Sequence, residues 1–309
     1  MNDPSSPRIA IIGSGAVGCY YGGRLALGGH DVCFHMRRDL EHVRRHGLIV
    51  QSCLGDFVLP QVQAFGSTEE MGAADLVVIT LKATANSALD ALIPPLLHDG
   101  TKLLTLQNGM GNEEYLADRW GADRVLGGVC FTCINRTAPG RIEHTAQGQI
   151  AIGAHVPASD AAAAEISALF NRCGIECALS ESIPAVRWKK LVWNIPFNGL
   201  AVLTGLTTDL ILADPALHAL ACSLMREIIG ISCALGHPLP DSFVDYQVQA
   251  TQTMRDYRPS SMIDFQESRE VEVEAIWGEP LRRARAAGLD AGRLEALYHL
   301  IHSAVSRRK

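Results

Sequence analysis

The segment WKKLVWNIPFN, residues 188–198, places polar side chains at a regular interval inside a long apolar stretch. Lys190, Asn194 and Asn198 are four residues apart, and residues at that spacing share one face of an α-helix. At about 100° per residue they fall within roughly 80° of one another, whereas Lys189 points away. Such a polar stripe must be bonded to something, because burying polar groups without partners is costly. An ammonium group in it could stabilise developing negative charge and supply a proton.

A second candidate site is a GxGxxG loop that directly follows the β-like run RIAIIG and directly precedes a helical pattern. Its first glycine permits a tight turn, its second lets a pyrophosphate approach the backbone, and its third lets helix and strand pack closely. The N–H groups at the helix N-terminus would point at the phosphate. The flanking strand and helix favour dinucleotide binding over an ordinary turn. The predicted cofactor-binding residues are Gly13, Ser14, Gly15, Ala16, Val17 and Gly18.

The residues after the second β-like run, DVCFHM, bear on which dinucleotide binds. An NAD site places an acid there to hold the ribose 2′-hydroxyl, but Arg37 and Arg38 stand at this point. A guanidinium suits a 2′-phosphate, so the sequence predicts NADP (NADPH), with Arg37 as the contact. Asp39 could be the displaced acid, but it is better placed to cap the next helix.

Polar residues also follow two further β-like runs. Ligands of a doubly wound sheet lie beyond the carboxyl ends of its strands. Lys82 lies at the end of one such run, VVITLKA. A lysine there is most often solvated, but its place beside the dinucleotide crevice predicts a cofactor contact. Asn108 and Gly109 end the run LLTLQNG. They could form a turn, since both tolerate positive φ, or the amide could contact cofactor and substrate together.

The elements that must position these residues change character along the chain. Short β-branched runs alternate with amphipathic stretches in the first part, which predicts an α/β, Rossmann-type, doubly wound parallel sheet with helices on both faces. The runs are 8–13, 31–36, 75–81, 102–107 and 125–131. Residues 140–153 have the pattern of a hairpin that turns at Gln147 and Gly148, a plausible antiparallel addition to the sheet.

Helical periodicity dominates from about residue 182 onward, which predicts an all-α second domain. The expected helices are 185–203, 215–235, 241–255, 264–277 and 292–305. We therefore predict an NADP-binding Rossmann domain at 1–182 and a helical substrate and catalytic domain at 183–309. In REVEVEAI, Glu270 and Glu274 share one helical face and Glu272 falls on the apolar side, where a buried acid needs a partner.

Composition narrows the class of partner. The formal charge of −6 argues against nucleic acid or a membrane surface as partner, because those need a basic face. No apolar run reaches the length of a membrane span and the N-terminus lacks a signal-peptide pattern, so we expect a cytoplasmic protein. Nine scattered cysteines fit reduced core thiols. Cys130 and Cys133 form a lone CFTC, for which two buried thiols are expected rather than a metal site.

Taken in order, several motifs resemble the ketopantoate reductases (2-dehydropantoate 2-reductases). They are GSGAVG, the strand-two arginine, TLKA, QNGMGNEE, RWKKLVWNIPFN, SSM at 260–262 and EVEAIWGEPLRRARAAGL at 272–289. The resemblance implies NADPH-dependent reduction of 2-dehydropantoate to pantoate, a step towards pantothenate and coenzyme A. It makes Lys190 the catalytic general acid. It makes Glu272 a second catalytic residue, near the cofactor and the reacting carbon. The other implied residues are Asn194, Asn198 and Ser261 for substrate, Asn108 for substrate and cofactor, and Cys133 for a backbone contact to the cofactor.

Departures from the family pattern lie near the expected substrate. The asparagine helix usually continues with proline after its second asparagine, but Gly199 stands here and Pro196 precedes it. Pro196 should remove a backbone hydrogen bond and kink the helix. Thr208 takes the place of another polar residue. The alternatives are therefore a reductase of another small branched 2-oxo acid, or a non-catalytic NADP(H)-binding sensor. The C-terminal helix could close a homodimer or cap its own domain.

Overall fold

The computed structural model describes residues 7–308, which divide into two compact units. The first unit runs through Gln107 and resumes at Asn112–Ile183. The second consists of the chain from Pro184 onward together with Asn108–Gly111. A four-residue loop that follows a strand of the first unit in sequence thus belongs by its contacts to the second.

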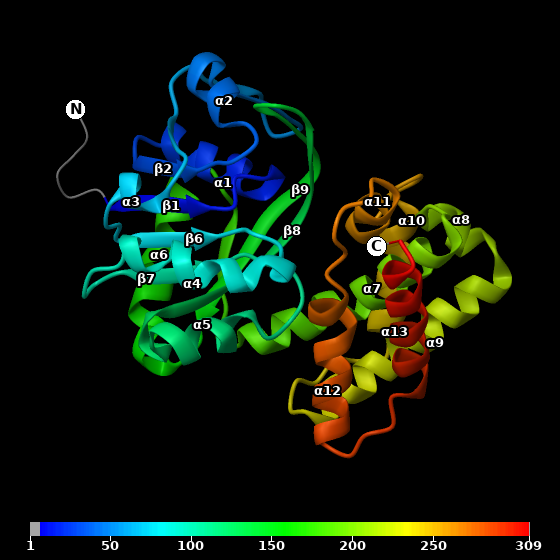
Figure 1. Cartoon of the computed structure of the whole chain (residues 1–309). Helices are drawn as coiled ribbons and strands as arrows, with labels where there is room; N and C mark the ends of the chain where they lie inside the picture. The colour runs from blue at the N-terminus through cyan, green and yellow to red at the C-terminus, as the bar shows by residue number, and fades with distance from the viewer. Residues whose placement is uncertain (1–6, 309) are drawn as a thin grey trace. The chain divides into compact units, whose positions relative to one another are not determined.

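One mixed sheet forms the centre of the first unit (Figure 1). Its order within the described residues is β4-β3-β9-β8-β7-β6-β1-β2-β5, with β10 paired to β9. Neighbours are parallel except for the pairs β3/β4 and β8/β9. The strands are β1 (Arg8–Ile12), β2 (Asp31–His35), β3 (Leu48–Ser52), β4 (Phe57–Leu59), β5 (Gln63–Phe65), β6 (Leu76–Ile79), β7 (Lys102–Thr105), β8 (Val125–Ala138), β9 (Arg141–Ala154) and β10 (Cys177–Leu179).

Helices cover both faces of this sheet, as the alternating pattern predicted. Ile9 and Ile11 of β1 enter one apolar core with α1 and α6, whereas Ala10 and Ile12 enter a second core with α3, α4 and α5. Both sides of each central strand are therefore buried, which is typical of parallel sheets. The helices are α1 (Ala16–Leu27), α2 (Leu40–His46), α3 (Thr68–Met71), α4 (Leu89–Leu92), α5 (Asn112–Trp120) and α6 (Asp160–Arg172), with the 3-10 turn η1 (Ala83–Ala88).

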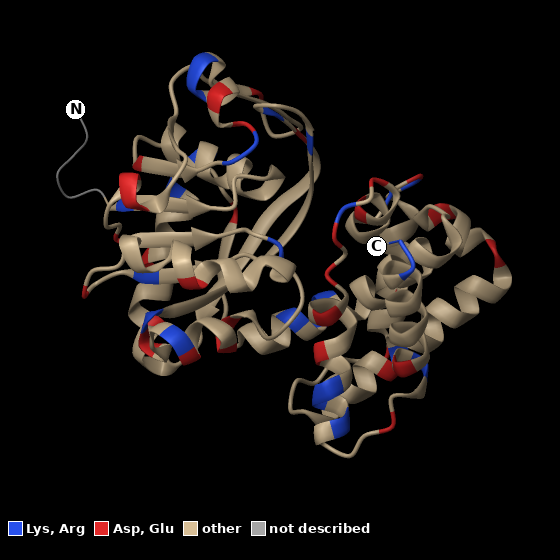
Figure 2. Cartoon of the chain, in the orientation of Figure 1, with Lys and Arg blue, Asp and Glu red and all other residues tan. Residues whose placement is uncertain are grey.

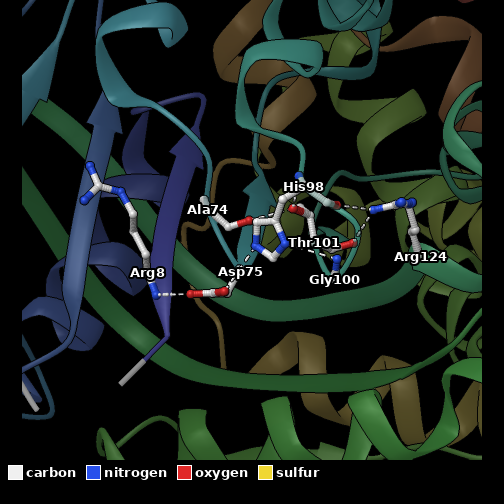
Figure 3. A network of polar contacts seen from close by, with 7 residues as sticks. All are labelled: Arg8, Ala74, Asp75, His98, Gly100, Thr101 and Arg124. Carbon is white, nitrogen blue, oxygen red and sulfur yellow. Dashed lines mark hydrogen bonds and ion pairs between the residues drawn. The ribbon is translucent and has the colours of Figure 1, made fainter. Parts of the chain in front are cut away.

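A network of hydrogen bonds joins residues at the amino ends of β1, β6, β7 and β8 (Figure 3). Asp75, just before β6, accepts from the Arg8 backbone N–H at 2.7 Å and lies 3.1 Å from Nε2 of His98. The other ring nitrogen of His98 accepts from the Gly100 N–H, so Nε2 carries the proton and donates to Asp75. Arg124, just before β8, donates to the His98 carbonyl. These polar groups are bonded to one another within the protein, and the candidate cofactor-binding residues that follow β1, β2 and β6 lie at the opposite, carboxyl ends of the strands.

The predicted antiparallel addition of residues 140–153 to the sheet is confirmed, but the predicted turn at Gln147 and Gly148 is wrong. β8 and β9 pair antiparallel along their length, and the chain turns at Gly140, where φ is +64°. Gln147 and Gly148 have φ of 64° and 120° and form a bulge inside β9, opposite the register shift between Phe131 and Thr132. Two adjacent residues with positive φ, here Gln147 and Gly148, occur in a bulge as well as in a turn, so the local pattern does not distinguish the two.

The second unit is helical around one apolar core. The expected helices 185–203, 215–235 and 292–305 are confirmed within two residues at each end, and 241–255 is shorter. The sequence did not predict α8 or α12. The helices are α7 (Ile183–Thr204), α8 (Thr208–Ala213), α9 (Pro215–Ala234), α10 (Phe243–Gln252), α11 (Ser260–Gln266), the π-helix η5 (Glu274–Gly278), α12 (Glu279–Ala286) and α13 (Gly292–Ser306).

The predicted single helix at 264–277 is wrong. α11 ends at Gln266, Ser268 has a positive φ of 55°, and helical structure resumes only around Glu274, as a π-helix. A non-glycine residue with positive φ breaks a right-handed helix. The apolar residues between the two pieces are buried by an irregular segment rather than by a helical face.

Helix α9 is, within the described residues, long and apolar enough by length and composition to cross a membrane, which is weak evidence by itself. It carries Arg226 and Glu227 near its middle. Glu227 accepts from the backbone N–H groups of Arg293 and Leu294 at 3.2 and 2.8 Å, at the start of α13. The N-cap residue of α13, Ala291, provides no side-chain bond, so α9 supplies the missing acceptor. Figure 2 shows charged residues mostly on helices and loops, while the central strands are largely uncharged.

We expect Glu227→Ala to lower the free energy of unfolding by about 1–3 kcal/mol, because it leaves two helix N–H groups without their acceptor. Glu295→Ala is the control, since Glu295 also lies in the first turn of α13 but its ion pair with Arg285 is about half exposed. Urea unfolding measures both. An equal loss in the two variants would contradict the capping role of Glu227.

Candidate active site

The glycine loop between β1 and α1 has the geometry of a phosphate-binding turn. Gly13 has φ of +105°, and a Cβ there would lie 2.4 Å from the backbone nitrogen of Leu81. A Cβ on Gly18 would lie 2.4 Å from the Gly13 carbonyl oxygen. At Gly15 a Cβ would meet nothing within 4 Å. The outer glycines are thus required by the protein's own packing, and the middle one faces open space where a ligand can approach the backbone.

The N-terminus of α1, at Ala16 and Val17, is suited to an anion. Its N-cap, Gly15, makes no side-chain cap bond, and the first turn has no acidic residue. The Ser14 hydroxyl donates to the His35 carbonyl at 2.7 Å, which ties the loop to the end of β2. Backbone N–H groups and the helix dipole there both favour negative charge. These residues fit the pyrophosphate of a dinucleotide.

The residues after β2 include two exposed cations and one paired acid. Arg37 and Arg38 are exposed. Asp39 occupies the N-cap position of α2 but makes no side-chain cap bond, so the predicted capping role is wrong. Its carboxylate instead receives two hydrogen bonds from Arg136, at 2.6 and 2.5 Å. Burial raises the pKa of Asp39, but the hydrogen bonds and charge of Arg136 outweigh it and hold that pKa below its ordinary value.

Two further predicted cofactor residues lie in the first unit. Lys82 immediately precedes η1, in the loop after β6, and is partly buried. Cys133 is buried in β8, and its carbonyl accepts from the Thr145 hydroxyl at 3.3 Å. Cys130 and Cys133 are both buried, and neither forms a disulfide within residues 7–308. Among residues 7–308 no group of three or more His, Cys, Asp or Glu side chains is arranged to hold a metal.

A chain of amides and a hydroxyl, which the sequence did not reveal, supports the loops after β6 and β7. The Thr105 hydroxyl donates to Gln107 Oε1 at 3.0 Å, and Gln107 Nε2 donates to Asn86 Oδ1 at 2.7 Å. Asn86 Nδ2 then donates to Asn112 Oδ1 at 3.1 Å. Asn86 lies in η1, so the network fixes the Lys82 loop against both residues that flank Asn108–Gly111.

In the second unit, Lys190 and Lys189 of α7 point in different directions, as the helical projection predicted. Lys190 Nζ donates to Asn108 Oδ1 at 2.6 Å. Lys189 points elsewhere and places its ammonium 5.7 Å from the centre of the Phe243 ring, on α10. The helical projection therefore distinguished the two adjacent lysines correctly. The asparagine after β7 and the lysine of α7, far apart in sequence, form one polar contact.

Arg187 belongs to the same stripe, and the sequence reasoning missed it. It lies three residues before Lys190, is 4% exposed and donates from Nη1 to the Gly109 carbonyl at 2.9 Å. Its position at i−3 from Lys190 was the available signal, because such residues share a helical face. Arg187 and Lys190 thus hold consecutive residues of one loop, the first by a backbone carbonyl and the second by a side-chain amide.

The loop is also bonded to the π-helix η5. Met110 N donates to the Ala275 carbonyl at 2.9 Å. Gly109 has φ of +79°, and a Cβ there would lie 2.3 Å from the same carbonyl oxygen. A π-helix shifts the backbone bonding pattern, and such distortions are frequent at functional sites. Only glycine combines this backbone angle with so close an approach.

Glu272 precedes η5 and is 7% exposed, whereas Glu270 and Glu274 are exposed. The predicted burial of the middle acid is confirmed, but it arises from an irregular segment and not from a helical face. Glu274 is instead bonded to Arg282 and Tyr298 at the surface. Glu272 is therefore the buried acid of this segment.

The two asparagines and Ser261 are all buried. Asn194 is 8%, Asn198 2% and Ser261 2% exposed. Asn198 Oδ1 accepts from the Ser261 backbone N–H at 3.0 Å, which joins α7 to α11. Helix α7 is assigned continuously through Pro196, and the indole N–H of Trp277 donates to the Ile195 carbonyl at 3.0 Å.

Comparison with known proteins decides the family. Residues 9–157 match the family model "Ketopantoate reductase PanE/ApbA" and residues 182–305 match "Ketopantoate reductase PanE/ApbA C terminal". A 2-dehydropantoate 2-reductase of Nostoc sp. is 40% identical over 297 residues, covering 94% of this chain and 93% of that protein.

The chain belongs to the ketopantoate reductase family. It is therefore an oxidoreductase with a nicotinamide cofactor and a small-molecule substrate. A crystal structure of 2-dehydropantoate 2-reductase from Geobacter metallireducens has 43% identity and a TM-score of 0.94, covering 96% of this chain and 99% of that one. Another, from Methylococcus capsulatus, has 31% identity and a TM-score of 0.87, covering 98% of each chain.

The departures from the ketopantoate reductase pattern have packing reasons in this chain. A Cβ on Gly199 would lie 2.8 Å from Leu297 and 3.1 Å from Ile301, so α13 packs closely where a proline would usually follow the second asparagine. Thr208 is fully buried, and its hydroxyl donates to the Arg255 carbonyl at 3.2 Å. That hydroxyl serves the protein's own backbone.

We expect Arg187→Met to lower kcat about 10- to 100-fold while cofactor affinity changes little, because small displacements of reacting groups have large effects on rate. The substitution removes the donor to Gly109 but keeps an apolar side chain. Steady-state kinetics and cofactor titration measure the two effects.

Lys189→Met is the matched control, since it removes a cation from the opposite side of α7. It should retain kcat within about twofold, as surface charge changes usually do little. A lower melting temperature with unchanged kcat in Arg187→Met would contradict its role in positioning the loop.

Proposed function

We propose that this ketopantoate reductase reduces 2-dehydropantoate to pantoate with NADPH, and that Lys190 is its general acid. The observation that carries the proposal is the Lys190 ammonium held 2.6 Å from Asn108, in line with Asn194 and Asn198 on one helix. Both family models match around these residues. The product leads towards pantothenate and coenzyme A.

In the proposed reaction, the ketone of the substrate accepts one hydride at carbon and one proton at oxygen. NADPH, when bound, supplies the hydride to the ketone carbon. The carbonyl oxygen then carries negative charge, which the Lys190 ammonium stabilises and neutralises by giving up a proton from Nζ. Asn108 Oδ1 accepts a hydrogen bond from that Nζ and so orients the ammonium. Solvent returns the proton to the amine after the product leaves.

The substrate's other polar groups need partners as well. We assign its hydroxyl and carboxylate to Asn194 and Asn198, with the Ser261 hydroxyl as a further donor to the carboxylate. Asn198 and Ser261 are already bonded to each other through the Ser261 N–H, so α7 and α11 present them together. Glu272 would accept from the substrate hydroxyl or a cofactor ribose and favour the charged form of Lys190. Its side chain is 7% exposed, and a carboxylate shielded from water in this way is a stronger hydrogen-bond acceptor than a solvated one.

NADPH is the proposed cofactor, rather than NADH, because of the residues after β2. Arg37 is exposed at the position where an acid would hold a ribose 2′-hydroxyl. The Asp39 carboxylate is paired with the Arg136 guanidinium. The glycine loop would hold the pyrophosphate through the N–H groups of Ala16 and Val17. Lys82, Asn108 and Cys133 are further proposed contacts to the cofactor.

We propose that the enzyme is cytoplasmic, and the lack of disulfides among residues 7–308 supports this. The C-terminal helix α13 packs on its own unit, through Gly199 of α7 and Glu227 of α9. This contact supports the capping role for α13. A homodimer through another surface stays a prediction, which sedimentation of the purified chain measures.

We expect Lys190→Ala to lower turnover about 10²–10⁴-fold, the usual contribution of a positioned acid, while NADPH affinity stays nearly intact. Lys189→Ala is the matched control and should keep near wild-type turnover. Initial rates of NADPH oxidation and fluorescence titration separate the two effects. Loss of NADPH binding in Lys190→Ala would mean instead that the lysine is structural.

A panel of branched 2-oxo acids with and without a 4-hydroxyl tests the substrate. A site built to bond that hydroxyl should prefer 2-dehydropantoate over its deoxy analogue by at least about tenfold, because the analogue leaves buried polar groups unpaired. Equal rates would favour another branched 2-oxo acid as the substrate. Turnover of any panel member above background would exclude the non-catalytic sensor.

A further inference from the structure

The tip of the β8–β9 hairpin contacts α2 from its N-cap residue, Asp39, to its C-cap residue, Gly47. Gly140 lies in the turn with φ of +64°, and a Cβ there would lie 2.9 Å from the Gly47 carbonyl oxygen and 3.1 Å from the His42 ring. The Gly140 N–H points to Asp39 Oδ2 at 3.4 Å. The turn therefore approaches α2 closely enough for groups of the hairpin to reach the residues that follow β2.

Arg136, near the end of β8, makes the main contact. Its Nε and Nη2 donate to the two carboxylate oxygens of Asp39, at 2.6 and 2.5 Å, across 97 residues of sequence. The Asp39 side chain is 12% exposed and that of Arg136 is 35% exposed. A bidentate guanidinium–carboxylate pair fixes orientation as well as neutralising charge.

The paired acid lies two residues after Arg37, the proposed contact for a 2′-phosphate. A carboxylate near this point in a dinucleotide fold can hold a ribose 2′-hydroxyl, and it repels a phosphate. Arg37 and Arg38 are exposed, and neither forms an ion pair within residues 7–308. The chain thus keeps two cations available and neutralises the adjacent acid.

We propose that Arg136 is a positioning residue for cofactor choice. By holding Asp39 in a bidentate pair, it prevents that carboxylate from repelling a 2′-phosphate or accepting from a 2′-hydroxyl. Arg136 acts through Asp39 and need not touch the cofactor. The inference rests on the proposed preference for NADPH. It adds Arg136, from a hairpin distant in sequence, as the residue that neutralises the acid beside the two arginines after β2.

The test is a double-mutant cycle with the full chain: wild type, Arg136→Gln, Asp39→Asn and the double variant. Affinities for 2′,5′-ADP and for 5′-AMP give the discrimination at the 2′ position without any turnover, and kcat/KM for NADPH and NADH gives it in catalysis. We expect Arg136→Gln to reduce the preference for the 2′-phosphate by about tenfold or more at low salt, because an unpaired like charge opposes the ligand.

The rescue is the decisive part of the cycle. Asp39→Asn alone should keep or raise the preference, and adding it to Arg136→Gln should restore the preference to within about threefold of wild type, because the repelling charge is gone. Arg141→Gln is the matched control, since Arg141 is an exposed cation on the same hairpin and should leave the preference nearly unchanged. Thermal melting checks that each variant is folded.

Three results would overturn the inference. One is an unchanged preference in Arg136→Gln. Another is a double variant with no better preference than Arg136→Gln, which would mean that the pair is merely structural. The third is a wild type that does not prefer 2′,5′-ADP over 5′-AMP, which would mean that the proposed use of NADPH is wrong and that Arg136 has no such role. If the wild type does prefer 2′,5′-ADP, the first two results test the role of Arg136 alone.

Discussion

The hydrogen bond from Lys190 Nζ to Asn108 Oδ1, 2.6 Å long, is the contact on which the rest of the candidate site depends. A cation on a largely apolar helix must be paired, and here a loop that follows β7 in sequence provides the partner. Arg187 bonds the next residue of that loop through its carbonyl, and Met110 bonds the π-helix. The hydrogen bond to Asn108 orients the amine, and the proposed role of Lys190 as general acid requires such preorganisation.

Several local irregularities follow from this requirement. Gly109 combines a positive φ with a 2.3 Å approach of its missing Cβ to the Ala275 oxygen, so the loop cannot carry a side chain there. The carbonyl of Ala275 belongs to a π-helix and is bonded by the Met110 N–H. Gly199 lets α13 approach α7 next to Asn198. These distortions cluster beside the polar stripe, where packing has been adapted to orient side chains.

Much of the fold and part of the site could be predicted from the sequence, and the misses have a common cause. Period-2 and period-3.6 patterns are local, so they identified the central strands, α7 and the orientation of Lys190 away from Lys189. Burial of Glu272 was predicted correctly, although the segment is irregular and not helical. Arg187 was overlooked although its i−3 spacing from Lys190 places it on the same helical face, while its partner, the Gly109 carbonyl 78 residues away, has no signal in the sequence. The hairpin turn, the π-helix and the Asp39–Arg136 pair likewise depend on contacts distant in sequence.

Chemical rescue of Lys190→Ala tests the central claim most directly. If Lys190 supplies the proton from a site shaped to hold an ammonium, small alkylammonium ions added to this variant should restore turnover in a saturable way. The restored rate should depend on the acidity of the ammonium ion. Lys189→Ala should not respond to the same amines. A Lys190→Ala variant that keeps wild-type turnover, or amines that accelerate both variants equally, would contradict the assignment of Lys190 as the acid.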